Sequence, residues 1–396
     1  MAKSLFNLLI VLFPIFSIYG FSPALDLGSI LIFITGTFCF LTKVSSTNLT
    51  LPDGYKCFFY VAIILGLLFI KTIPLRLILF TINLYFACKY IDINKFIFYY
   101  NKTVYFCCLF FIIQELTYCL FNERISGIVN FIPTIYGDNT DKIIDQVING
   151  SRSPSFFSEP SYLAQYIFPY IIIKMNSINK KDIQKGILAS LVILLTFSGT
   201  GIFLLFIIWI IWFLFSNIKF AIKFTTAFIC ILGVLIILIY DNSIFDSLLN
   251  RSVELQSYEG DEEYISSGFI RFFRGYFLYE ELPLTNKLLG SSNTLIASLM
   301  NENIYFMGKE KFLNGVQTLL IYNGLLVCIL YFRHLILFYK KSPNSLMLAM
   351  IICYLFLMIG ESYYLSSRSF IVILILCGIT NNSLNLKNKQ ITQLKY

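Results

Sequence analysis

The chain has 396 residues, of which 57% are hydrophobic and 17% aromatic, while only 13% are charged. Soluble globular proteins carry roughly 25% charged residues, so this composition, with a mean hydropathy of +0.75, excludes an ordinary soluble domain and indicates a polytopic membrane protein. The net charge of +8 does not indicate nucleic-acid binding, because the basic residues are scattered between apolar runs and form no stripe or tail.

Apolar runs long enough to cross a bilayer follow one another along most of the chain. A membrane helix needs roughly 20 mostly apolar residues, and about 12 such runs can be counted. We therefore predict an all-α polytopic integral membrane protein. Its spans are expected near residues 4–22, 28–43, 57–71, 74–91, 103–121, 161–176, 186–198, 200–217, 224–240, 314–332, 345–360 and 367–380. The first run is followed by no small-residue cleavage site, so we expect a retained helix rather than a signal peptide.

Lysine and arginine are concentrated in alternate loops, and such loops are cytoplasmic in membrane proteins. The clearest of them contains Lys174, Lys180, Lys181 and Lys185. The short turns on the other side are nearly bare of charge, with Lys71 and Arg76 as exceptions. We therefore expect both termini to be cytoplasmic and the hydrophilic stretches 122–160 and 241–313 to be extracytoplasmic.

These boundaries divide the chain into five parts. They are helices 1–5 over residues 1–121, a first outer loop over 122–160, helices 6–9 over 161–240, a large outer loop with an amphipathic helix over 241–313, and helices 10–12 with a cytoplasmic tail over 314–396. A transporter would carry its charges inside the spans. The predicted spans of this chain are nearly free of charge, and Glu115 is their clearest carboxylate. Because loops longer than about 12–15 residues are usually functional or disordered, we predict a site at the outer interface.

The first outer loop ends in a polar stretch, SRSPSFFSEPSYLAQY, at residues 151–166. Pro160 suits the first position of a helix, where its missing N–H costs nothing, and Glu159 would then lie at or beside the N-cap. A capped helix start explains the serines, the glutamate and the proline. It leaves Arg152 unexplained.

The second outer loop contains the segment SSGFIRFFRGYFLYEELPL, in which Arg271 and Arg274 are three residues apart. On a helix these two side chains share a face, and the surrounding aromatic residues suit an interfacial helix. An ordinary amphipathic surface helix would look much the same. Together with Arg152, however, these side chains could converge on one multivalent anion, since arginine forks bind phosphates in bidentate fashion.

Several short segments, in this order, resemble the Wzy-type O-antigen and capsular polysaccharide polymerases. They are RSPSFFSEPSYLAQY, the tight turn TFSGTGIFLL at 196–205, IRFFRGYF, PLTNKLLGSSN and NGVQTLLIYNGLLVCILYF. The resemblance covers residues from about 150 to 335. It implies a GT-C-like membrane glycosyltransferase in the bacterial inner membrane, active in O-antigen or other polysaccharide biosynthesis.

Such enzymes transfer a glycan from undecaprenyl diphosphate onto another carrier-linked repeat unit at the outer face of the membrane. The resemblance implies that Arg152, Arg271 and Arg274 stabilise the departing diphosphate, without a metal or another cofactor, and that Glu159 aligns or deprotonates the acceptor hydroxyl. Other carboxylates that could serve are Glu254, Glu259, Asp261, Glu262 and Glu263. Substrate-binding roles are expected for Ser161, Tyr162, Tyr276, Tyr279 and Arg368.

Two other functions stay open. An O-antigen ligase uses the same donor with a lipid A core acceptor, but ligases of that type carry a histidine in the long outer loop, and 241–313 has none. A lipid-linked oligosaccharide flippase would need charges in a central cavity. The expected partners of a polymerase are lipid-linked oligosaccharides, membrane lipid and a chain-length regulator protein that no residue identifies.

The predicted orientation can be tested without an activity assay. Topology-reporter fusions after residues 140 and 280 should report an extracytoplasmic location, and fusions after 182 and 390 a cytoplasmic one, because of the lysine and arginine asymmetry. A cytoplasmic signal at 280 would remove the predicted outer site.

Overall fold

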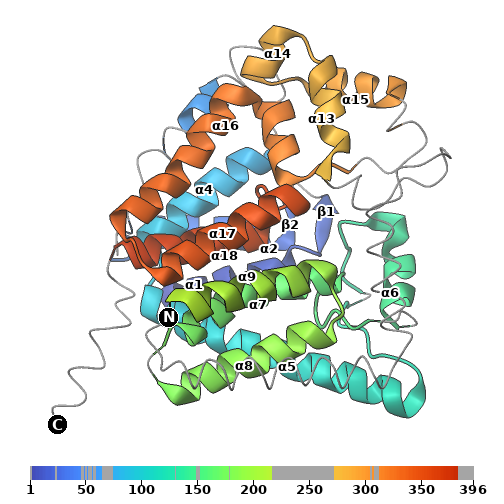
Figure 1. Ribbon diagram of the computed structural model, residues 1–396, viewed down its shortest axis with the longest axis vertical. Coiled ribbons are helices and arrows are strands. Elements are labelled where there is room, and N and C mark those ends of the chain that lie inside the picture. The colour runs from blue at the N-terminus through green and yellow to red at the C-terminus, as the bar shows by residue number, and fades with distance from the viewer. Residues whose placement is uncertain are drawn as a thin grey trace.

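The computed structural model shows a mostly helical protein with one small two-stranded sheet (Figure 1). It describes residues 2–22, 25–45, 49, 51, 56, 59–64, 75–129, 131–148, 152–177, 179–215, 272–303, 306 and 312–381. Within these ranges, most apolar side chains join a single hydrophobic core.

The N-terminal region pairs two helices through a short hairpin. Helix α1 (Ala2–Phe16) is followed by β1 (Gly20–Ser22), β2 (Leu25–Asp26) and α2 (Leu27–Leu41). Gly20 has φ 140°, and a Cβ there would come within 2.6 Å of the Leu25 carbonyl oxygen, so the hairpin needs glycine at this position. The predicted span 4–22 is therefore too long at its C-terminal end.

Two long helical segments follow. Helix α4 (Leu75–Tyr90) leads into α5 (Ile93–Phe121), which starts about ten residues before the predicted span because Asp92 caps it, accepting hydrogen bonds from the Asn94 and Lys95 amides. The first outer loop then contains the short helix α6 (Thr140–Ile148), which lies beside the bundle in Figure 1.

The central part of the chain forms three consecutive helices, α7 (Pro160–Met175), α8 (Lys180–Leu195) and α9 (Gly199–Phe215). Residues 196–198 alone connect α8 to α9, which confirms the predicted tight turn. Most residues of α7 are buried, because this helix packs against α5, α8, α9 and α17.

The described part of the second outer loop folds into α13 (Arg274–Glu281), α14 (Leu284–Leu289) and α15 (Asn293–Glu302). These helices gather at one end of the molecule around the start of α16 (Figure 1). They bury a small core of their own, built around Leu278, Ile296 and Ile321. The outer loop is thus a packed unit in its described part.

The C-terminal helices complete the bundle. They are α16 (Gly315–Lys341), α17 (Ser345–Gly360) and α18 (Ser367–Thr380). Gly324 interrupts α16 with φ 83°, and the Ile321 carbonyl freed near this break accepts a hydrogen bond from the Ser291 amide. The outer-loop unit therefore supplies a donor where helix α16 is broken.

Ten of the predicted spans coincide with described helices, apart from shifted ends. The span predicted at 57–71 is helical where it is described, at 59–64, and the span at 224–240 lies outside the described residues. Two helices, α5 and α16, are long and apolar enough to cross a membrane, and α1, α2, α9, α17 and α18 are shorter apolar helices.

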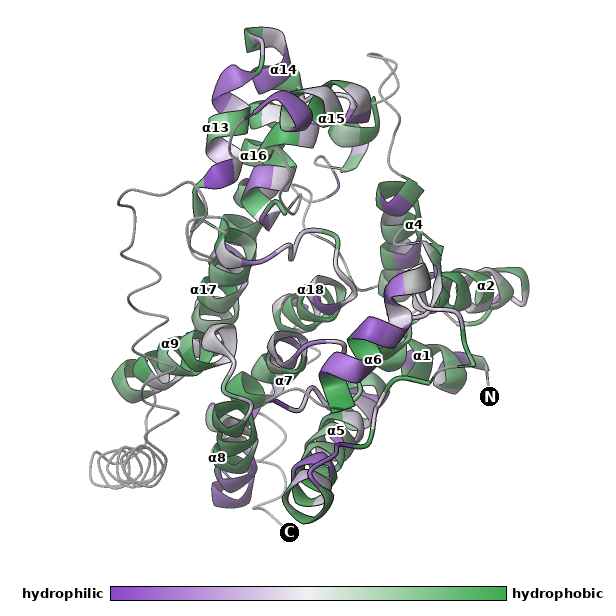
Figure 2. Cartoon of the chain, turned by 90° about the vertical axis from the view of Figure 1, so that its right-hand side faces the viewer, coloured by the Kyte–Doolittle hydropathy of each residue, from purple (hydrophilic) through white to green (hydrophobic). Residues whose placement is uncertain are grey.

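Helix α5 has a largely exposed apolar surface. Only 22% of its most apolar window is buried, and its exposed side chains include Tyr105, Phe106, Leu116, Leu120 and Phe121. Figure 2 shows the hydrophobic colour of α5 and α9, with hydrophilic residues gathered on α6 and at one end of α8. A continuous apolar face of this size is typical of a surface covered by lipid or by an apolar partner.

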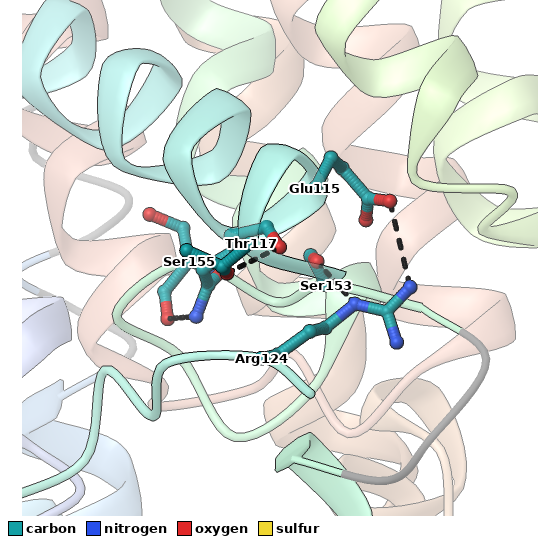
Figure 3. Close-up of polar contacts among 6 residues, drawn as sticks. Glu115, Thr117, Arg124, Ser153 and Ser155 are labelled. Carbon is teal, nitrogen blue, oxygen red and sulfur yellow. Dashed lines mark hydrogen bonds and ion pairs between the residues drawn. The ribbon is translucent and has the colours of Figure 1, made fainter. Parts of the chain in front are cut away.

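A buried latch fastens the polar stretch at 152–159 to α5 (Figure 3). The Gln114 side chain donates to the Ile125 and Ser155 carbonyls at 2.8 and 3.3 Å and accepts from the Ser155 amide at 2.8 Å. Beside it, the Arg124 Nε donates to the Ser153 hydroxyl at 2.8 Å, and Nη2 lies 3.4 Å from Glu115. Glu115, which the sequence predicts to be an intramembrane carboxylate, therefore has an ion-pair partner in Arg124.

The latch predicts a stability effect. Gln114→Leu keeps the side-chain volume but leaves the buried Ser155 amide without its acceptor, so it should destabilise the protein by about 1–3 kcal/mol. Thermal unfolding of the detergent-purified protein measures this loss. Cys119→Ser, on the exposed face of the same helix, is the control and should unfold like the wild type. Equal unfolding midpoints for all three proteins would contradict the latch.

Candidate functional site

A cavity of about 340 Å³ lies where the ends of α1, α2, α4, α7, α16 and α18 meet. Its wall combines arginine, aspartate, tyrosine and serine side chains with Phe13, Phe80 and Phe157. Every contributing helix reaches the cavity with the end that the lysine and arginine asymmetry predicts to lie outside the membrane. The size and the mixed lining are typical of a small-molecule site.

Arg368 is the central cation of this cavity. It lies in the first turn of α18, and its Cζ is 3.6 Å from the centre of the Tyr162 ring, at the start of α7. Such a cation–π contact contributes roughly 0.5–2 kcal/mol. The Nε and Nη1 atoms of Arg368 are buried and have no hydrogen-bond partner in the described structure. Because unsatisfied buried donors are costly, these atoms are suited to a ligand acceptor.

Arg76 supplies a second positive charge. Its Nε donates to the Leu365 carbonyl at 3.3 Å, and its guanidinium is within electrostatic range of both Asp26 and Arg368. Leu365 has φ 54°, a left-handed conformation that is rare for leucine and that clusters at functional sites. This strained connection between α17 and α18 directs its carbonyl at Arg76.

Asp26 partly offsets these charges. Both carboxylate oxygens accept hydrogen bonds from Ser29, from its amide and its hydroxyl, each at 2.8 Å. Burial raises the pKa of Asp26, while the Ser29 hydrogen bonds and the charge of Arg76 lower it. Since Asp26 faces Arg76, Arg368 is the cation with the greater capacity for an external anion.

Hydroxyl groups surround the arginines. The Tyr136 hydroxyl and the Ser158 hydroxyl are 2.9 Å apart, and the hydroxyls of Ser17 and Ser367 are also 2.9 Å apart. Burial raises the pKa of Tyr136, so this phenol stays protonated at neutral pH and can donate a hydrogen bond. The wall therefore offers neutral donors and acceptors beside a charged centre.

Glu159 occupies the N-cap of α7 and Pro160 follows it in the first turn, as the sequence predicts. The Glu159 side chain makes no capping hydrogen bond. Instead, Glu159 Oε2 accepts a hydrogen bond from the Ser161 hydroxyl at 3.0 Å. The carboxylate is exposed and within electrostatic range of Tyr136 and Tyr162. Glu159 does not line the cavity, but it is exposed and follows Ser158, which does.

A second carboxylate, Glu361, is within electrostatic range of Tyr162. Glu361 ends α17, is 5% exposed, and accepts a hydrogen bond from the Thr200 hydroxyl at 2.6 Å. Through this bond the start of α9 is joined to the residue that begins the connection between α17 and α18. Glu361 was not among the predicted site residues.

Arg152 and Arg274, two of the three arginines predicted from the outer loops, do not line this cavity. Arg152 is half-buried and donates to the Phe197 carbonyl at 3.3 Å. Arg274 is fully buried, with Cζ 4.4 Å from the Phe306 ring and Nη2 donating to the Phe312 carbonyl at 3.3 Å. Arg271 and the acidic alternatives at 254–263 lie outside the described residues. The predicted convergence of the three arginines therefore stays a prediction.

Of the five residues predicted to bind substrate, the structure places three at or beside the cavity. Tyr162 and Arg368 line it, and Ser161, which precedes Tyr162 in the chain, is hydrogen-bonded to Glu159. Tyr276 and Tyr279 lie on α13 in the outer-loop unit, where the Tyr279 hydroxyl donates to the Lys287 carbonyl at 3.1 Å.

Arg76 and Asp26 were missed as site residues. The one sequence signal was the position of Arg76 in an outer turn that is otherwise nearly free of charge, where it interrupts the lysine and arginine asymmetry. A charge that breaks a topology rule near a membrane span is a functional candidate. No such signal marks Asp26, because an aspartate before a helix is also an ordinary N-cap.

The arrangement suits a compact polyvalent anion that carries a hydroxyl-rich group. A guanidinium with unused donors would take the charge, and tyrosine and serine hydroxyls would bind the polar substituent. Comparison of the chain with models of known protein families found no match, and comparisons with curated proteins and with solved structures also found none.

The cavity predicts binding of a diphosphate. Inorganic pyrophosphate should raise the thermal unfolding midpoint of the detergent-purified protein, because a ligand that binds only the folded state stabilises it. Arg368→Ala should weaken this binding at least tenfold, and Arg76→Ala less, since Asp26 already offsets Arg76. Lys287→Ala, on α14, is the control and should bind as the wild type does. Unchanged binding in Arg368→Ala would remove Arg368 from the site.

Proposed function

We propose that this chain is a membrane glycosyltransferase that polymerises undecaprenyl-diphosphate-linked oligosaccharide repeat units at the outer face of the bacterial inner membrane. In this proposal the chain has about 12 spans, both termini are cytoplasmic, and the cavity around Arg368 opens to the extracytoplasmic side. The product would be O-antigen or a related polysaccharide.

The observation that carries the proposal is Arg368 itself. A guanidinium with two buried donors that no described group satisfies sits among hydroxyl groups at the end of an apolar helix bundle. A lipid diphosphate would fit this position, because its apolar chain would lie in the bilayer and its charged diphosphate at the membrane interface. The sequence resemblance points to the same class of substrate.

Arg368 and Arg76 would act on the leaving group. When the bond between the anomeric carbon and the diphosphate oxygen breaks, the bonding electron pair leaves with the diphosphate and its negative charge increases. Cations held in place beforehand stabilise that charge more than the ground state. The Tyr162 ring restricts the orientation of the planar Arg368 guanidinium, and a fixed orientation favours a bidentate contact with phosphate oxygens.

Glu159 would act on the acceptor. A new bond forms between the anomeric carbon and an acceptor hydroxyl oxygen, and the hydroxyl proton passes to the Glu159 carboxylate and then to water. The exposed position of Glu159, with Oε2 already accepting from Ser161, supports this role. Glu159 follows Ser158, which lines the cavity, and a second substrate could approach its exposed carboxylate.

Arg152, Arg271 and Arg274 remain predicted contributors from the sequence. In the described structure Arg152 and Arg274 donate to backbone carbonyls, which favours a structural contribution for these two. Alanine variants separate the possibilities, because loss of a structural contact lowers stability whereas loss of a leaving-group contact lowers the rate at normal stability.

The test uses a deletion strain complemented with plasmid-borne variants. Without the gene, lipopolysaccharide should carry a core with one repeat unit. A bare core would indicate a ligase or a flippase instead.

In the same strain, Arg368→Ala should abolish or severely reduce polymerisation at normal abundance in the membrane, since losing one contact to a developing anion costs about 3 kcal/mol, or roughly a hundredfold in rate. Arg368→Lys should recover only part of the activity, because lysine keeps the charge but not the planar fork. Lys287→Ala should polymerise normally. The proposal fails if Arg368→Ala supports wild-type banding at wild-type abundance.

A further inference from the structure

A second hollow, of about 450 Å³, lies between α15 and α16 in the outer-loop unit. Asn293, Ile296, Ala297 and Met300 line it from one face of α15, with the three- and four-residue spacing of a helix. Thr318 and Tyr322 line it from α16, also four residues apart. We call this hollow the α15–α16 groove.

The groove adjoins the cavity around Arg368. Thr318 and Ser362 line both, Thr318 from the first turns of α16 and Ser362 from the connection between α17 and α18. A ligand held by its charged end at Arg368 could therefore extend past these two hydroxyl groups into the groove. Ser362 lies in the connection between α17 and α18, and Arg368 follows in the first turn of α18, so one short segment of the chain contributes to both regions.

The lining of the groove is suited to a saccharide. It offers the Asn293 amide and the two hydroxyls, together with the aromatic rings of Phe312 and Tyr322, and it contains no charged side chain. Aromatic faces pack against the C–H faces of sugar rings while amides and hydroxyls bind the sugar hydroxyls. An ionic ligand would find no counter-charge here.

Arg274 holds one wall of the groove. Its guanidinium donates to the Phe312 carbonyl and stacks on Phe306. The following residue, Gly275, lies against the Gln317 side chain so closely that a Cβ would come within 2.5 Å of it. Gln317 in turn forms the capping box of α16 with Asn314. Arg274, which the sequence analysis named as a candidate site residue, therefore helps to hold Phe312 in the wall of the groove.

We propose that the α15–α16 groove binds the saccharide of the diphosphate-linked donor, whose diphosphate is held at Arg368. This inference rests on the proposed function and assigns to the groove the sugar units next to the reacting bond. Arg274 is then a positioning residue that acts through Phe312 and does not touch the diphosphate.

The test compares two ligands on the full-length, detergent-purified protein. The first is undecaprenyl diphosphate, and the second is the same carrier bearing the repeat unit of the host strain. The wild type should bind the second more tightly. Asn293→Ala and Phe312→Ala should each weaken binding of the saccharide-bearing lipid at least fivefold and leave binding of undecaprenyl diphosphate unchanged. Asn293 is exposed, so its variant carries little risk of misfolding.

Controls keep the two proposals apart. Ser298→Ala lies on α15 but does not line the groove, and it should bind both lipids as the wild type does. Unchanged binding of the saccharide-bearing lipid in both groove variants would overturn the groove assignment and leave the proposed function intact.

If the wild type binds neither lipid, the proposed function fails, and the repeat-unit oligosaccharide released by mild acid becomes the probe. The groove assignment as a saccharide site is then upheld if Asn293→Ala and Phe312→Ala weaken that binding fivefold. It is overturned if they do not.

Discussion

The candidate site depends on how the Arg368 guanidinium is held at the end of an apolar helix bundle. Burying a cation without partners is costly, and the described structure offsets this cost with the Tyr162 ring and an opening toward a polar cavity. The two side chains stand at the starts of α18 and α7, which are among the most buried helices of the bundle. A site built on such rigid elements keeps its geometry.

The first outer loop makes this arrangement possible. Its polar stretch is fixed to α5 by Gln114, whose amide satisfies the backbone of Ser155 inside the protein. A few residues later the chain places Ser158 and Tyr162 in the wall of the cavity, with Glu159 between them in sequence. The polar run between two apolar segments therefore has two roles. Its first part hydrogen-bonds to Gln114 on α5, and its last part contributes to the candidate site.

The helical bundle could be predicted from the sequence because apolar runs and capping residues are local signals. The N-cap at Glu159 and the break between α8 and α9 are examples. Helix ends were less predictable where polar residues belong to a helix, as in the first turns of α5. The broken helix α16 was also missed, because a glycine within an apolar run shows its φ only in three dimensions.

The candidate site was only partly predictable. Tyr162 and Arg368 were named from the ends of their spans, but pairing Arg76 with Asp26 and Arg368 requires knowing which helices are neighbours. Arg274 illustrates a different difficulty, since an arginine in an aromatic segment can face a ligand or brace a carbonyl. Its burial against Phe306 favours the brace.

The most direct test of the account is an experimental structure of the full chain with undecaprenyl diphosphate. The account predicts that the diphosphate contacts the Arg368 guanidinium, with Tyr162 beneath it and Glu159 facing the space where an acceptor would lie. A diphosphate bound at Arg152 or Arg274, with the cavity at Arg368 empty of ligand, would contradict it.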